Sequence, residues 1–226
     1  QLLVGAFDSG QSTAIAQVAE QKGIPYVINI AAAPAITEQG YKFVFRNFPT
    51  AAMILGDAFA NQKEVFAESG KEPKSVVFLH VNDTFGTAMK NGISAVMPRF
   101  NMPYTIKETI SYDPTARDLS VEVAKAKATG AEVLLGVSRL NDAILLTREM
   151  VKQRWEPQIT VAVGPGYYEG PYMKTLGKIG NYVLSTVPWY DPRKPLAQKM
   201  IQAHQTMFPG QVIDTNTVFT FEAMLI

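Results

Sequence analysis

Short apolar runs alternate with amphipathic segments along this chain, and the alternation predicts an α/β fold. The first apolar run, residues 2–7, stops at Asp8, and a helical pattern follows over residues 14–22. Gly23 ends that pattern, and a second apolar run covers residues 24–30. A strand, a helix and a strand within about thirty residues form a βαβ unit, whose two strands lie side by side and parallel.

A polar or small-residue loop follows each of these two strands. Residues 8–13 form the first loop and residues 31–34 the second. Both loops leave the carboxyl ends of their strands, where open α/β sheets bind ligands. The first loop also opens a helix, whose unpaired N–H groups, together with the hydroxyls of Ser9 and Ser12, would suit a carboxylate. From this stretch alone, a simpler interpretation remains open, in which Ser9 or Ser12 only caps the helix.

The same alternation continues to the end of the chain. It predicts further strands at residues 41–46, 75–80, 105–111, 133–137 and 160–163, and helices at residues 50–69, 87–97, 118–129, 142–153 and 196–208. Over residues 217–226 the pattern breaks off within an element whose type it does not decide.

Two breaks in this pattern suggest a discontinuous domain arrangement. One is the polar, proline-containing segment at residues 71–74, and the other is the proline- and aromatic-rich segment at residues 187–192. We therefore expect two Rossmann-like lobes with parallel sheets, joined by hinge strands. Lobe 1 would comprise residues 1–73 plus 188–226, and lobe 2 residues 74–187. Ligand binding would close a cleft between them.

Composition excludes several classes of function. Hydrophobic residues make up 47% of the chain and charged residues 18%, which suits a globular protein with a sizeable core. The net charge of +1, without a basic block, argues against a nucleic-acid partner. Cysteine is absent, and the two histidines, His80 and His204, are far apart. We therefore expect no metal and no cofactor.

Nothing in the sequence indicates an enzyme or a membrane-spanning segment. A nucleophile with its base, a carboxylate pair and a dinucleotide fingerprint are all missing from the pattern. No apolar run approaches the ~20 residues of a membrane helix. The chain opens inside a predicted strand without a signal peptide, which fits both a processed secreted protein and a cytoplasmic one.

Several segments, taken in order, resemble a known family. They are Leu-Val-Gly-Ala-Phe-Asp-Ser-Gly (3–10), Ala-Gln-Val-Ala-Glu-Gln-Lys-Gly-Ile-Pro (16–25), Ala-Ala-Ala-Pro-Ala-Ile-Thr (31–37), Phe-Arg-Asn (45–47), Asn-Asp-Thr-Phe-Gly (82–86) and Tyr-Asp-Pro-Thr-Ala-Arg-Asp (112–118). Together they resemble the type I periplasmic solute-binding proteins, in particular the branched-chain amino acid (Leu/Ile/Val) binding proteins of ABC transporters. The resemblance implies a complete second lobe and a first lobe that is incomplete in this chain.

The resemblance also implies a set of ligand contacts. In the family, the loops corresponding to Ser9 and to Ala31–Ala33 hold the ligand's carboxylate and amino group, and Ser9 aligns with a serine that binds the carboxylate. The chain departs from the amino-acid binders at two positions. Ala32 or Ala33 stands where they have a threonine, and Gly166 where they have a glutamate that pairs with the ammonium.

Arg139 falls in a loop that contributes an aromatic contact in the family. If it faces the cleft, its guanidinium offers a planar fork for a carboxylate; alternatively it caps the following helix or pairs with Asp142. Losing the ammonium partners while gaining an arginine favours an organic acid. Aromatic acids are plausible because aromatic residues occupy loop positions near the expected cleft, namely Phe7, Phe85, Tyr167, Tyr168, Trp189 and Tyr190. Phe7 and Trp189 are equally suited to packing at the hinge.

The resulting expectation is an extracytoplasmic receptor of an ABC transporter, periplasmic or at the cell surface. It would capture a small carboxylate-bearing solute, either an aromatic or other organic acid or a branched-chain amino acid, and present it to a membrane permease. The alternative is a ligand-sensing regulator on the same fold that controls a partner protein. A signal peptide ahead of residue 1 would favour transport, and its absence a cytoplasmic sensor.

Overall fold

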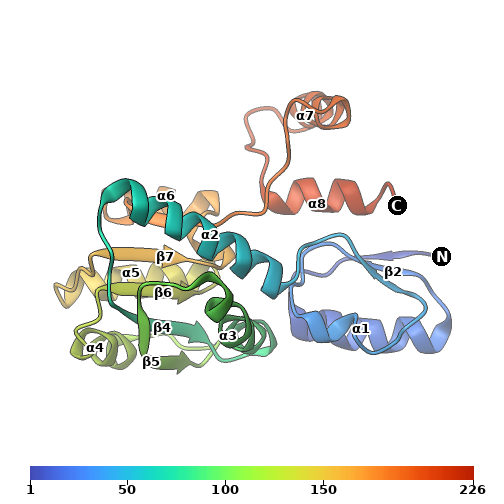
Figure 1. The fold of residues 1–226 in the computed structure, drawn as a ribbon. Coiled ribbons are helices and arrows are strands. Elements are labelled where there is room, and N and C mark those ends of the chain that lie inside the picture. The colour runs from blue at the N-terminus through green and yellow to red at the C-terminus, as the bar shows by residue number, and fades with distance from the viewer. The chain divides into compact units, whose positions relative to one another are not determined.

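The computed structural model describes residues 1–226 as two compact units (Figure 1). Unit 1 consists of residues 1–50 and 188–226, and unit 2 of residues 51–187. The chain thus leaves unit 1 once and returns to it. No helix in either unit combines the length and apolar character required to cross a membrane.

Unit 1 is built on a three-stranded parallel sheet in the order β1-β2-β3. Helix α1 (Ser9–Lys22) connects the first two strands and contacts β2 and β3. It ends at Gly23, whose left-handed backbone (φ 64°) suits a residue without a side chain. The strands are β1 (Leu3–Val4), β2 (Tyr26–Ile28) and β3 (Val44–Arg46).

The C-terminal segment of unit 1 is held against the N-terminal segment. It contains helices α7 (Pro195–Met207) and α8 (Thr215–Ala223). The Asn29 side-chain amide donates to Thr220 Oγ1 (2.6 Å), and that of Asn47 donates to the Phe219 carbonyl (2.9 Å). These contacts explain how residues 188–226 rejoin the first fifty residues in one unit.

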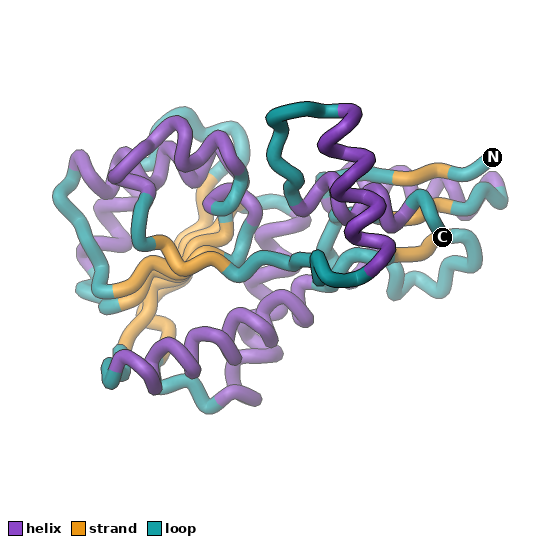
Figure 2. Tube along the Cα trace, turned by 90° about the horizontal axis from the view of Figure 1, so that it is seen from above, coloured by secondary structure: helices purple, strands orange, loops and turns teal.

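Unit 2 contains a five-stranded parallel sheet in the order β5-β4-β6-β7-β8. Right-handed crossovers place α3 on one face and α4, α5 and α6 on the other, and helices are seen on both sides of the strands (Figure 2). The strands are β4 (Ser75–Val81), β5 (Thr105–Tyr112), β6 (Val133–Val137), β7 (Ile159–Ala162) and β8 (Val183–Ser185). The helices are α2 (Ala51–Ser69), α3 (Thr84–Val96), α4 (Ser120–Ala128), α5 (Leu140–Lys152) and α6 (Gly170–Leu176).

The strand order creates a topological switch point between β4 and β6. From β4 the chain moves to β5 on one side, and from β6 it moves to β7 on the other. The loops that leave the carboxyl ends of β4 and β6 therefore diverge, and such a point is the preferred ligand position in open α/β sheets. Both strands are buried along their whole length, which fits their central place in the sheet.

The structure differs from the sequence prediction over the first domain boundary. Helix α2 lies in unit 2, whereas the polar break at residues 71–74 had suggested that it belongs to lobe 1. Its apolar face packs on α3, where Leu55 Cδ1 lies 2.6 Å from the position that a Cβ on Gly92 would occupy. A polar break marks a loop, but the packing of the helix before it decides which unit that helix joins.

The α/β alternation and the parallel sheets are confirmed, although several elements differ from the prediction in length. Helix α1 begins at Ser9 instead of Ala14. Strand β6 matches the predicted range, residues 133–137. Helix α6 and strand β8 were not predicted, because their runs of seven and three residues are too short to show a clear period.

The packing of α2 leads to a stability prediction. Leu55 is fully buried, so Leu55→Ala should lower the free energy of unfolding of unit 2 by about 3 kcal/mol through lost burial and a residual cavity. Met53 lies on the same helix with 60% of its surface exposed, and Met53→Ala should change stability by less than about 0.5 kcal/mol. Urea denaturation of both variants measures the difference. Equal effects would contradict the docking of α2 in unit 2.

Candidate functional site

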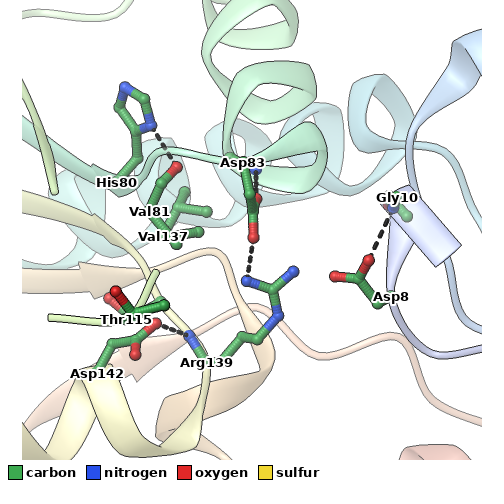
Figure 3. A network of polar contacts seen from close by, with 12 residues as sticks. Asp8, Gly10, His80, Val81, Asp83, Thr115, Val137, Arg139 and Asp142 are labelled. Carbon is green, nitrogen blue, oxygen red and sulfur yellow. Dashed lines mark hydrogen bonds and ion pairs between the residues drawn. The ribbon is translucent and has the colours of Figure 1, made fainter. Parts of the chain in front are cut away.

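The loop after β1 is closed by Asp8, which is the N-cap of α1. Its Oδ1 accepts hydrogen bonds from the N–H groups of Gly10 (2.8 Å) and Gln11 (3.0 Å), and its carbonyl accepts from Ser12 (Figure 3). The prediction that Ser9 or Ser12 caps the helix was therefore wrong. Because Asp8 already occupies these first-turn donors, the helix N-terminus itself is not an open anion site.

Ser9 brings the two loops of unit 1 together. Its side chain is 1% exposed, and its Oγ accepts a hydrogen bond from the Ala33 N–H (3.4 Å). Ser9 thus joins the loop after β1 to the loop after β2. A hydroxyl that accepts one hydrogen bond still has its own proton to donate, and a carboxylate is a suitable acceptor.

Arg46, the last residue of β3, donates hydrogen bonds to the loop that contains Ala31–Ala33, which we call the alanine loop. Its guanidinium donates to the Ala31 carbonyl and, at 2.6 Å, to the Ala33 carbonyl. Burial lowers the pKa of Arg46 from its ordinary value, yet an arginine stays charged at physiological pH. The alanine loop therefore rests on a partly buried positive charge, a role that sequence analysis did not assign. The sequence signal for this role was the position of Arg46 at the carboxyl end of a predicted strand.

In unit 2, the loops at the switch point carry an ion pair beside an aromatic ring. Asp83 follows β4 and caps α3, accepting from the Gly86 N–H at 2.9 Å through Oδ1. Its Oδ2 accepts from Arg139 Nη1 (Figure 3). The Arg139 guanidinium lies 5.5 Å from the centre of the Phe85 ring. Such a distance allows a cation–π contact. Sequence analysis had named Phe85 and Arg139 but missed Asp83.

The backbone of Arg139 and its side chain have different partners. Arg139 occupies the N-cap position of α5, and its N–H donates to Asp142 Oδ2 at 3.3 Å. The interpretation that Arg139 pairs with Asp142 is thus correct only for the backbone, since the guanidinium pairs with Asp83. Burial raises the pKa of Asp142, and its hydrogen bond to Arg139 opposes that rise.

A close backbone approach fixes the Arg139 loop in place. The Gly166 N–H donates to the Ser138 carbonyl at 3.1 Å. A Cβ on Gly166 would lie 2.2 Å from the Arg139 carbonyl oxygen, and one on Gly164 would lie 2.8 Å from that of Ser138. Only glycine permits this contact, because any side chain at position 166 would collide with the Arg139 carbonyl.

Tyrosines buried under this loop support it from within. Tyr112 donates to Ser138 Oγ at 2.9 Å, and the Tyr167 ring packs 5.3 Å from that of Tyr172. The Tyr167 hydroxyl lies 2.9 Å from the place of a Cβ on Gly136, in the interior of unit 2. Burial raises the pKa of both Tyr112 and Tyr167, so both hydroxyls stay protonated at physiological pH. Tyr112 is thus a buried support of the Ser138 loop.

The remaining predicted residues lie elsewhere in their units. Phe7 precedes the Asp8 cap and is 38% exposed. The Tyr190 ring packs at a tilt of 40° against that of Trp189, with 5.0 Å between ring centres. Tyr190 also lines a cavity of about 360 Å³ formed with α7 and α8. This cavity differs from the edge formed by Ser9 and Ala33.

His80 is buried, and its Nδ1 donates to the Val81 carbonyl at 2.8 Å. No cluster of three metal-binding side chains is present.

Comparison with known proteins gives a consistent family assignment. The model of the periplasmic binding protein family matches residues 1–226. A Leu/Ile/Val-binding protein homolog 7 from Brucella suis biovar 1 (strain 1330) is 27% identical over 180 residues, which cover 77% of this chain and 44% of that protein. The chain therefore spans less than half the length of this curated relative.

Solved structures share the fold at low sequence identity. The leucine-binding protein LivK from Thermotoga maritima superposes with a TM-score of 0.82 at 18% identity, covering 98% of this chain and 61% of that one. A solute-binding protein of an ABC transporter from R. palustris, in complex with benzoate, gives a TM-score of 0.78 at 18% identity, with 98% and 59% covered. Another from R. palustris, in complex with 4-hydroxybenzoate, gives 0.76 at 14% identity, with 99% and 60% covered.

The close approach of Gly166 to Arg139 leads to a second stability prediction. Gly166→Ala should lower the free energy of unfolding by about 2–3 kcal/mol, because the new methyl group meets a backbone carbonyl that has little room to move. Gly170→Ala is the matched control, since a Cβ there meets no atom within 4 Å. Thermal or urea denaturation measures both. If the two variants are equally stable, the loops after β6 and β7 are not in this contact.

Proposed function

Because the chain belongs to the periplasmic binding protein family, we propose that it forms part of the extracytoplasmic solute receptor of an ABC transporter. Such a receptor captures a small solute and presents it to a membrane permease. Units 1 and 2 would correspond to its two lobes, and each would contribute ligand contacts. Ser9 and Ala31–Ala33 are the proposed contacts from unit 1, and Phe85, Arg139 and Gly166 those from unit 2.

The single observation that carries the proposal is the hydrogen bond between Ser9 and Ala33. This bond brings the Ser9 hydroxyl next to the alanine loop, at the carboxyl edge of the sheet, where α/β folds bind ligands. The positive charge of Arg46 behind that loop favours an anion there. We therefore propose a carboxylate-bearing solute as the ligand.

Two features favour an organic acid over an amino acid. Gly166 provides no carboxylate for an ammonium group. The Arg139 carbonyl lies so close that position 166 has no room for a side chain carrying a carboxylate. The Asp83 carboxylate, on the loop after β4, is already engaged by Arg139 and by the α3 cap. The Phe85 ring beside Arg139 suits an aromatic acid. Two structural neighbours hold benzoate and 4-hydroxybenzoate.

Calorimetric titration tests the ligand class. Benzoate and 4-hydroxybenzoate should bind about a hundredfold more tightly than leucine, isoleucine or valine, because a buried ammonium without partners costs several kcal/mol. Tighter binding of the aliphatic amino acids would overturn the choice of an organic acid. If no small carboxylate binds, the receptor function itself is wrong.

Ser9 can be tested separately with a matched serine on the same helix. Ser9→Ala should weaken carboxylate binding about tenfold to a hundredfold, which is typical for a lost hydrogen bond to a charged group. Ser12 is equally buried but donates to the Ala6 carbonyl at 3.3 Å, so Ser12→Ala should leave the affinity within about threefold. Equal losses in both variants would mean that Ser9 acts through the fold and not through the ligand.

A further inference from the structure

A cavity of unit 2 lies at the amino-terminal ends of β7 and β8, on the opposite edge of the sheet from the loops after β4 and β6. Its volume of about 540 Å³ is within the range of small-molecule sites. Thr160 of β7 and its parallel partner Val183 of β8 line it, together with the C-terminal end of α5. All of its lining residues belong to unit 2, so this unit forms the cavity alone.

Two residues of the lining have a left-handed backbone, which favours glycine. Arg154 (φ 50°) follows the C-cap of α5, and its N–H donates to the Val151 carbonyl at 3.0 Å. The next N–H, that of Trp155, donates to the Met150 carbonyl at 2.9 Å and completes a Schellman motif, in which the left-handed residue is usually glycine. Tyr182 (φ 65°), the residue before β8, is the second case. Both residues therefore carry a side chain at a conformational cost.

The fold gains little from either side chain. Tyr182 is 98% exposed, so its ring buries almost no surface. Arg154 is exposed, and its guanidinium takes part in no ion pair and no hydrogen bond. A costly backbone conformation whose side chain stabilises nothing within the protein points to a function for that side chain outside the fold.

The charges and rings of the lining suit an aromatic anion. Arg154 and Lys178 supply two positive charges without an ion-pair partner, and Glu156 supplies one negative charge, so the lining is positive as a whole. A guanidinium offers a planar fork for an oxyanion. Trp155 and Tyr182 supply aromatic rings beside these cations, and such rings bury a planar apolar group well.

We propose that this cavity is a second binding site of the protein, which takes a planar aromatic anion. Arg154 and Lys178 bind the anionic group, and Trp155 and Tyr182 contact the ring. The bound ring buries the exposed Tyr182 side chain, which offsets the cost of its left-handed backbone. The site lies wholly in unit 2 and does not rest on the proposed solute receptor function.

An NMR titration observes this cavity selectively, because Trp155 and Trp189 are the two tryptophans of the chain and Trp189 lies in unit 1. The substitution Trp189→Phe leaves the indole N–H signal of Trp155 as the only one. 1-Naphthalenesulfonate should shift this signal with a Kd at least about tenfold lower than that of 1-naphthylmethylammonium, which has the same rings and a positive charge. Methanesulfonate, which has no ring, should bind at least about tenfold more weakly than 1-naphthalenesulfonate.

Arg154→Gly separates a role in binding from a role in folding. It should weaken 1-naphthalenesulfonate binding about tenfold, while the Tm stays unchanged or rises by about 2 °C because glycine suits the left-handed position. Arg154→Asn also removes the charge and tolerates this backbone, so it should weaken binding equally. Arg148→Gln is the matched control, because Arg148 is exposed on α5 but does not line the cavity. It should change neither the Kd nor the Tm.

The inference is refuted if 1-naphthalenesulfonate leaves the Trp155 signal unshifted or if the cationic probe binds as tightly. It is also refuted if both Arg154 variants bind like wild type. A fall of several degrees in the Tm of Arg154→Gly would mean that Arg154 stabilises the end of α5 instead, through the helix dipole. Ser9→Ala should leave the Trp155 titration unchanged, so failure at this cavity and failure of the proposed function are distinguishable.

Discussion

The candidate site depends on how loops at the carboxyl edge of a parallel sheet satisfy their backbone groups. Beyond the end of a strand, a loop has no neighbouring strand to pair with, and burying its carbonyls without a donor would cost free energy. In unit 1 the donor is Arg46, whose guanidinium donates to the carbonyls of Ala31 and Ala33. The alanine loop can be buried and still keep one shape because of this arginine.

In unit 2 the corresponding loops are held mainly by contacts between their backbones. The loop containing Gly164 and Gly166 approaches the loop containing Ser138 and Arg139 so closely that side chains are excluded, and Gly166 donates directly to the Ser138 carbonyl. Tyr112 adds a buried hydroxyl donor to Ser138. The two units therefore position their loops by different means, a charged side chain in one and glycine contacts in the other. A substitution at Gly166 should affect stability first, whereas one at Ser9 should affect binding first.

The sequence predicted those features that depend on local pattern. The βα alternation, the parallel sheets and the place of Ser9 beside the alanine loop all follow from short apolar runs and the residues after them. Features that depend on distant partners were missed. Arg139 and Asp83 are 56 residues apart, so no local pattern pairs them. Likewise, the start of α1 was predicted too late, because Ser9 to Thr13 look like loop residues until the Asp8 cap is known. Helix α2 was assigned to the wrong unit for a similar reason, since only its packing on α3 decides the matter.

Both units place an aspartate at the helix N-terminus that faces the ligand-binding edge. Asp8 caps α1 through the N–H groups of Gly10 and Gln11, and Asp83 caps α3 through the N–H group of Gly86. Part of the positive charge at each helix N-terminus is therefore compensated by a carboxylate of the protein itself. A carboxylate ligand of the proposed receptor would therefore depend more on side-chain donors than on these helix termini, and in unit 1 the proposed donor is the Ser9 hydroxyl beside the alanine loop. The capping aspartates stabilise their helices and, by the same contacts, reduce the attraction of the helix termini for an anion.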